Sequence, residues 1–196
     1  MPKYRPENLV KPTSAFVVKQ MQISETSTAR SLYYTFQYAI RHVQSQRDEY
    51  GKTMRRLLSH PNFNINYVNE EYQTLLHMAC CSDVMTNIGA HMLISDERCD
   101  INVQNFAGYT PLIMCVRLAS SMQGYYGSII QALLSRSTIK VNLFDNCNET
   151  ALDKIAQRMA ANKGSFKMKE LKTIQNALVA KGASLRGYEK LLAESG

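Results

Sequence analysis

The sequence contains no tryptophan and no apolar run near the roughly 18–20 residues that a membrane-spanning helix needs. Its first residues are charged and lack the apolar stretch of a signal peptide. Hydrophobic residues make up 45% of the chain and charged residues 20%, which is ordinary for a folded protein. These features exclude a membrane protein and a wholly disordered chain, and they predict a folded domain.

Metal-ligand patterns are also missing. The five cysteines are an odd number without C-x-x-C spacing, and the four histidines do not cluster with them. Structural zinc sites need such paired ligands, so we expect no metal ion. Thiols scattered over apolar helical positions are typical of a reducing compartment, and we therefore expect a cytoplasmic protein.

No common catalytic signature occurs in the chain. There is no phosphate-binding glycine loop, no dinucleotide fingerprint, no H-E-x-x-H and no G-x-S-x-G. His77 and the Cys80–Cys81 pair are the candidates for a base and a nucleophile, but the sequence places no partner beside either. We therefore expect no catalytic residue, no cofactor and no enzyme activity.

The formal charge of +7 suggests nucleic-acid binding until it is divided along the chain. Residues 1–60 carry a net +6, residues 61–150 a net −4 and residues 151–196 a net +5. A single groove for a polyanion needs basic residues on one continuous face. Binding of nucleic acid or an anionic surface through the basic ends is thus an alternative, not the leading hypothesis.

A short pattern occurs three times: an apolar residue and an asparagine, then a threonine eight residues after that asparagine. The copies are Ile65-Asn66 with Thr74, Ile101-Asn102 with Thr110, and Val141-Asn142 with Thr150. The threonines are 36 and 40 residues apart, and each copy has another apolar residue seven positions before its Ile or Val. Offsets shared at both ends of a unit predict repeats that stack and bury their apolar faces against each other.

Residues 103–112 are the best-formed copy. Gly108 supplies a positive φ, Thr110 is a good N-cap, and Pro111 at the first helical position loses no hydrogen bond. In the first copy, we expect the His77 ring to hydrogen-bond backbone groups of adjoining repeats.

The segment Thr74-Leu75-Leu76-His77-Met78-Ala79 resembles the T-P-L-H-x-A helix start of ankyrin repeats, and Thr110-Pro111-Leu112 keeps its first half. The family's glycine two residues before the threonine is Gly108 here, Asn148 in the last copy and Tyr72 in the first, where it departs from the pattern. The resemblance implies an all-α fold: an ankyrin-type helical solenoid of about three repeats plus a helical N-terminal cap hairpin.

The expected organisation follows from these offsets. Residues 1–27 form a lead-in in which 14–23 have the composition of a short helix, and residues 187–196 form a tail. Between them, the ankyrin-type domain covers residues 28–186, divided into 28–60 (hairpin), 61–96, 97–136 and 137–186.

The resemblance implies a monomeric, non-enzymatic module that binds another protein through its concave face and turn tips. The contact positions it implies are Glu70, Glu71, Gln73, Ser82, Phe106, Ala107, Tyr109, Arg117, Asn146, Cys147, Glu149 and Arg158. The residues expected to support the fold are Thr74, His77, Gly108, Thr110, Pro111 and Thr150. Lengthened repeats of this kind also resemble effectors that intracellular bacteria deliver into host cells, which is a further alternative.

Phe106 and Tyr109 are the strongest candidates among the contact residues, because two large aromatics on one exposed turn gain free energy only when something covers them. In the alternative arrangement, Tyr109 packs on Tyr72 or Phe144 of the neighbouring turns.

Overall fold

The computed structural model describes residues 27–42, 47–81, 88–119, 126–165 and 167–186. The all-α class is confirmed for this part of the chain, which holds eight helices, no strand and one isolated antiparallel bridge between Phe144 and Thr150. The helices are α2 (Ala29–His42), α3 (Arg47–Leu58), α4 (Leu75–Cys80), α5 (Ile88–Ser95), α6 (Pro111–Leu118), α7 (Tyr126–Ser135), α8 (Ala151–Ala161) and α9 (Met168–Ala180). The short helix expected over residues 14–23 and the tail at 187–196 lie outside the described residues.

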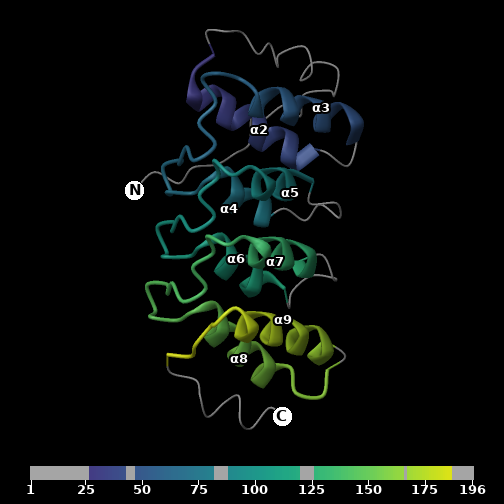
Figure 1. Cartoon of the computed structure of the whole chain (residues 1–196), viewed down its shortest axis with the longest axis vertical. Coiled ribbons are helices and arrows are strands. Elements are labelled where there is room, and N and C mark those ends of the chain that lie inside the picture. Colours follow the sequence, from purple (N-terminus) through teal and green to yellow (C-terminus); the bar gives the residue numbers. More distant parts are fainter. Residues whose placement is uncertain (1–26, 43–46, 82–87, 120–125, 166, 187–196) are drawn as a thin grey trace, which may run out of the picture.

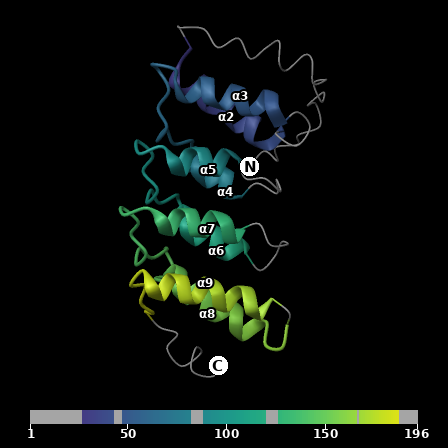
Figure 2. The same ribbon diagram turned by 45° about the vertical axis from the view of Figure 1, so that its right-hand side comes forward.

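The helices form four consecutive pairs stacked along the long axis of the molecule (Figure 1). Helices α2, α4, α6 and α8 pack on one another in sequence, and α3, α5, α7 and α9 do the same in a second layer. The segments that lead into α4, α6 and α8 project from the same side of the stack in both views (Figures 1 and 2). Residues 36–40 positions apart are therefore neighbours on that side.

Each of α4, α6 and α8 begins directly after a threonine of the repeated pattern. The N-caps are Thr74, Thr110 and Thr150, and the hydroxyl of each accepts a hydrogen bond from the backbone N–H three residues on. Such a bond satisfies one of the free N–H groups of the first helical turn, and its loss typically costs about 1 kcal/mol. Pro111 starts α6, where its missing N–H has no cost.

The apolar residues of the pattern form the core between the two layers. Of the apolar residues seven positions before the Ile or Val, Ile94 and Leu134 are buried and Leu58 is half-buried. The leucine one position earlier is fully buried in the last turn of α3, α5 and α7, and the Ile or Val eight residues after it is buried beneath the outgoing loop. These residues are Leu57, Leu93, Leu133, Ile65, Ile101 and Val141. Each unit alone would leave this apolar surface in water, so burial couples neighbouring units.

The asparagine of the pattern connects each unit to the next. Asn102 Nδ2 donates to the carbonyl of Thr138 at 3.0 Å, and its Oδ1 accepts the N–H of Lys140 at 2.8 Å. Asn66 and Asn142 make the same two kinds of contact with the loops 32–42 residues further on. An amide is needed here because it donates and accepts at once.

No helix within the described segments is long and apolar enough to cross a membrane.

Candidate functional site

The three turns that precede α4, α6 and α8 share one backbone geometry. Each begins with a residue whose side-chain oxygen accepts the N–H groups two and four positions later; these residues are Asn69, Asn105 and Asp145. The residue three positions later has a positive φ in every case: 57° at Tyr72, 75° at Gly108 and 62° at Asn148. The turns are therefore equivalent, although different residue types occupy them.

Tyr72 is the strained member of this set. Left-handed backbone costs an L-residue other than glycine, asparagine or aspartate about 1–2 kcal/mol. Tyr72 departs from the glycine expected at this position, yet its turn has the same backbone conformation as the other two. Two hydrogen bonds to Asn69 Oδ1, from the N–H groups of Glu71 and Gln73, hold the backbone on both sides of Tyr72 in place.

Gly108 is needed for space as well as for its backbone angle. A Cβ at this position would lie 2.7 Å from the backbone nitrogen of Asn146 and 2.9 Å from the Cα of Asp145. The second turn thus packs against the third through bare backbone, and the N–H of Asn146 donates to the carbonyl of Ala107 at 3.2 Å.

Two exposed aromatic rings lie together on the first and second turns. The Tyr72 and Phe106 rings are 5.5 Å apart between centroids and meet edge to face at 71°. Tyr72 is 57% exposed and Phe106 71% exposed, and the N–H of Phe106 donates to the carbonyl of Glu71 at 3.2 Å. Phe106, taken from the sequence as a contact residue, is thus available at the surface; Tyr72, its partner, was not among the predicted contacts.

The expectation that Tyr109 is the exposed partner of Phe106 is wrong. Tyr109 is half-buried, and its ring lies 4.8 Å from the guanidinium carbon of Arg117 and 5.8 Å from Lys154 Nζ. Its carbonyl accepts a hydrogen bond from His77 Nε2 at 2.9 Å. Tyr109 thus faces the cations of α6 and α8, and the ring that Tyr72 contacts is that of Phe106.

A buried charge cluster lies beside Tyr109. Lys154 Nζ is 2.7 Å from Asp145 Oδ2, whose side chain is fully buried, and it also pairs with Glu149. Gln157 donates a further hydrogen bond to Glu149. Burial alone would raise the pKa of Asp145, but the Lys154 ammonium and the N–H groups of the turn outweigh it and hold that pKa below its usual value.

Asp145, Cys147 and Glu149 have potential metal-ligand atoms within 4.8 Å of one another. The Lys154 ammonium is already paired with both carboxylates, and the hydrogen bonds to them raise its own pKa against the effect of burial. A metal ion would have to displace a lysine held between two carboxylates. This arrangement is a salt-bridge cluster of the fold.

His77 connects the first unit to the second. Its Nδ1 accepts the N–H of Thr74 at 3.2 Å, so the proton of the neutral ring lies on Nε2, which donates to the carbonyl of Tyr109. Burial lowers the pKa of His77 and outweighs the hydrogen bonds to backbone carbonyls, which raise it. A charged ring would place a second proton against the Thr74 N–H.

The pKa of His77 is lower in the folded state than in the unfolded state. Its contribution to the free energy of unfolding should therefore be complete above the unfolded pKa of about 6.5 and should decrease as the pH falls below it. We expect His77 to contribute a slope of up to about 1.4 kcal/mol per pH unit below pH 6.5, measured as the free energy of unfolding in urea. His77→Gln should remove that contribution. His91→Gln, which removes a histidine from α5 and leaves the Thr74–His77–Tyr109 connection intact, should keep it; equal slopes in the two variants would contradict this assignment.

The other predicted contact residues are distributed over the turns and the last turns of the helices. Glu70, Glu71, Ala107, Asn146 and Cys147 are exposed, Gln73, Glu149, Arg117 and Arg158 are half-buried, and Ser82 lies outside the described residues. Several already make hydrogen bonds within the fold: Arg158 donates to the carbonyl of Arg117 at 2.6 Å, and the carbonyl of Gln73 accepts a hydrogen bond from the Tyr33 hydroxyl at 3.2 Å.

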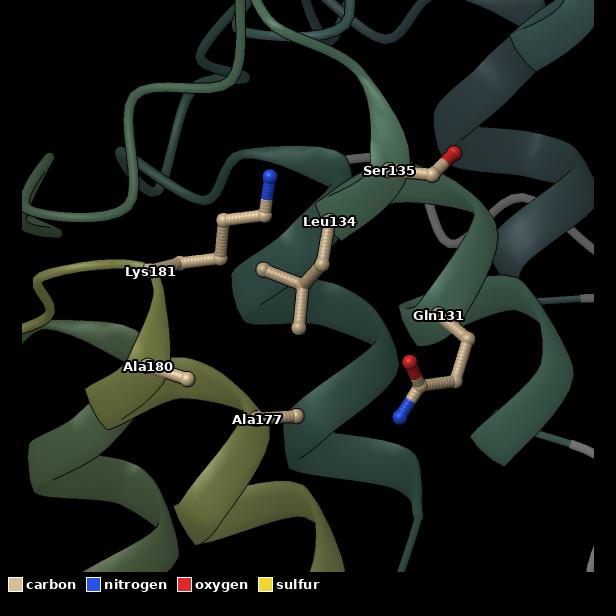
Figure 3. Close-up of a pocket in the computed structure, with 6 residues that line it drawn as sticks. All are labelled: Gln131, Leu134, Ser135, Ala177, Ala180 and Lys181. Atoms are coloured by element: carbon tan, nitrogen blue, oxygen red, sulfur yellow. The ribbon is translucent and has the colours of Figure 1, made fainter.

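Among the residues that the structure describes, a pocket of about 260 Å³ lies between α7 and α9. Figure 3 shows Leu134 of α7 pointing toward Ala177 and Ala180 of α9, with Gln131 and Lys181 on either side. Its lining has one titratable group, Lys181, and one hydroxyl, Ser135, which donates to the carbonyl of Ala132; no carboxylate, histidine or cysteine lines it.

A comparison with protein-family models finds no match to this chain, and a comparison with curated proteins finds none either.

Proposed function

We propose that this chain is a non-enzymatic protein-binding module, an ankyrin-type helical solenoid of about three repeats behind an N-terminal hairpin. Three features support the solenoid: two layers of helices packed in sequence, threonine-capped helices 36 and 40 residues apart, and asparagines that connect successive loops. Such a stack presents its turn tips and first helices along one side, as a binding surface for an extended partner.

The Tyr72–Phe106 pair carries the functional part of this proposal. Two large rings stand more than half exposed on adjacent turns, and one of them is fixed by a backbone conformation that tyrosine rarely adopts. Strain of this kind concentrates at sites where geometry serves binding. Rigid aromatic side chains also dominate binding energy at protein interfaces. The partner therefore covers this pair.

Affinity purification with matched variants tests the proposal. Tyr72→Asn/Phe106→Ser removes both rings and gives the first turn the residue type that the third turn carries at the same angle, Asn148. Lost edge-to-face packing and relieved strain are of similar size, so unfolding stability should change by less than about 1 kcal/mol. Val179→Ser, which removes an exposed apolar side chain from α9, is the control.

We expect at least one protein that the wild type and Val179→Ser retain and that Tyr72→Asn/Phe106→Ser loses. Retention of the same proteins by all three would contradict the proposed site.

The charge distribution gives less support to the alternative of polyanion binding. Arg55 and Arg56 are exposed on α3, and Lys169 and Lys172 are exposed on α9. Figure 1 places α3 and α9 at opposite ends of the stack. Two separate basic ends do not form the continuous face that binding across several phosphates requires.

A further inference from the structure

At two places, exposed aromatic and acidic groups contact the chain's own arginines. Arg186 lies over the Phe144 ring, with 4.0 Å from its guanidinium carbon to the ring centroid. Arg30 donates to Glu70 at 2.8 Å and lies 5.9 Å from the centroid of Tyr34. In both places, the guanidinium carbon lies within 5.9 Å of the centroid of an aromatic ring near the surface.

In the described part of the chain, three exposed groups on the first and second turns have no such contact with an arginine. The carboxylate of Glu71 has no ion pair, and no cation lies over the ring of Tyr72 or Phe106, among the residues that the structure describes. Glu71 adjoins Tyr72 in the chain, and its carbonyl accepts the N–H of Phe106, so the three residues belong to one surface feature. We call Glu71, Tyr72 and Phe106 the open tip.

We propose that the open tip binds an arginine side chain of an extended segment of the partner protein. This inference rests on the proposed protein-binding function and names the chemistry of the partner. The guanidinium stacks on the Phe106–Tyr72 pair, as Arg186 does on Phe144, and it pairs with the Glu71 carboxylate, as Arg30 does with Glu70. The exposed carboxylate of Glu71 favours a cationic segment.

Arginine fits this geometry better than lysine. Its planar guanidinium stacks on aromatic faces and presents a fork of donors to a carboxylate, whereas the lysine ammonium is a strongly hydrated point charge.

Selection from a random 12-residue peptide library displayed on phage tests the inference on the full chain. The wild type is the target, and binders that Tyr72→Asn/Phe106→Ser also retains are discarded. We expect the surviving peptides to be enriched in arginine. Surviving peptides without a preferred cation would overturn this inference while leaving the proposed function in place. If no peptide survives the counter-selection, both fail.

The best peptide then gives a quantitative test by fluorescence anisotropy. Replacing its preferred arginine by citrulline, which has the same shape without the charge, should weaken binding roughly tenfold. Lysine in that position should give an intermediate affinity. Glu71→Gln should weaken binding of the arginine peptide but not of the citrulline peptide, and Glu97→Gln, which neutralises an exposed carboxylate on an exit loop, should alter neither. Equal affinities for arginine and citrulline peptides would contradict the inference.

Discussion

Lys154→Met alone is expected to lower the free energy of unfolding by about 3–5 kcal/mol, because it leaves a buried carboxylate without its counter-charge. Asp145 is fully buried and Lys154 is the cation 2.7 Å from its Oδ2. The loss should be measured by urea denaturation at pH 7, where the carboxylate is ionised in the wild-type protein because Lys154 and the turn N–H groups lower its pKa. A change below about 1 kcal/mol would show that the ion pair is not important for stability.

The residues of the first repeat indicate which further substitutions should restore the stability lost in Lys154→Met. The positions of Asp145, Glu149 and Lys154 in the third unit correspond to Asn69, Gln73 and Met78 in the first. Asn69 Oδ1 accepts the same two backbone N–H groups as Asp145 Oδ1, and Asn69 Nδ2 faces Gln73 Oε1 at 3.4 Å. The triple variant Asp145→Asn/Glu149→Gln/Lys154→Met should therefore recover wild-type stability to within about 1 kcal/mol. A triple variant as unstable as Lys154→Met would contradict the equivalence of the two turns.

Gly108→Ala is expected to lower the free energy of unfolding by about 2–4 kcal/mol. The positive φ of 75° accounts for about 1–2 kcal/mol of this, and displacement of the third turn, whose backbone would lie under 3 Å from the new Cβ, accounts for the rest. Asn148→Ala is the control, since it has a similar φ of 62° and already carries a Cβ. Asn148→Ala should lower the free energy of unfolding only by the cost of the positive φ, about 1 kcal/mol. Equal losses in the two variants would show that the close approach to Asn146 is not important.

Much of the fold was predictable because its signals are local. A threonine before a helical stretch caps that helix whatever its neighbours are, and the offsets from Thr74 to Thr110 and Thr150 state the repeat length directly. The apolar residues near the end of each second helix follow the repeat spacing, and Ile94 and Leu134 are buried; in the first of these helices Leu57 is buried and Leu58 only half-buried. These inferences needed no knowledge of how distant segments meet.

The candidate site was predicted only in part, because its central ring contact joins residues 34 positions apart. Phe106 was identified, but its ring partner is Tyr72 and not its neighbour Tyr109. The direction of each ring depends on the sign of φ within the turn, which the sequence left open at Tyr72. One signal for the Lys154 cluster was available: the third unit has Asp and Lys where the first two have Asn and Met.

The protein-binding account depends on the Tyr72–Phe106 pair, and the affinity of a captured partner tests it most directly. Isothermal titration should compare the wild type with Tyr72→Asn/Phe106→Ser, after urea denaturation has shown that the two differ by less than about 1 kcal/mol in stability. The account predicts an affinity at least about 30-fold weaker in the variant, which corresponds to the loss of an interface hot spot. Equal dissociation constants would contradict it.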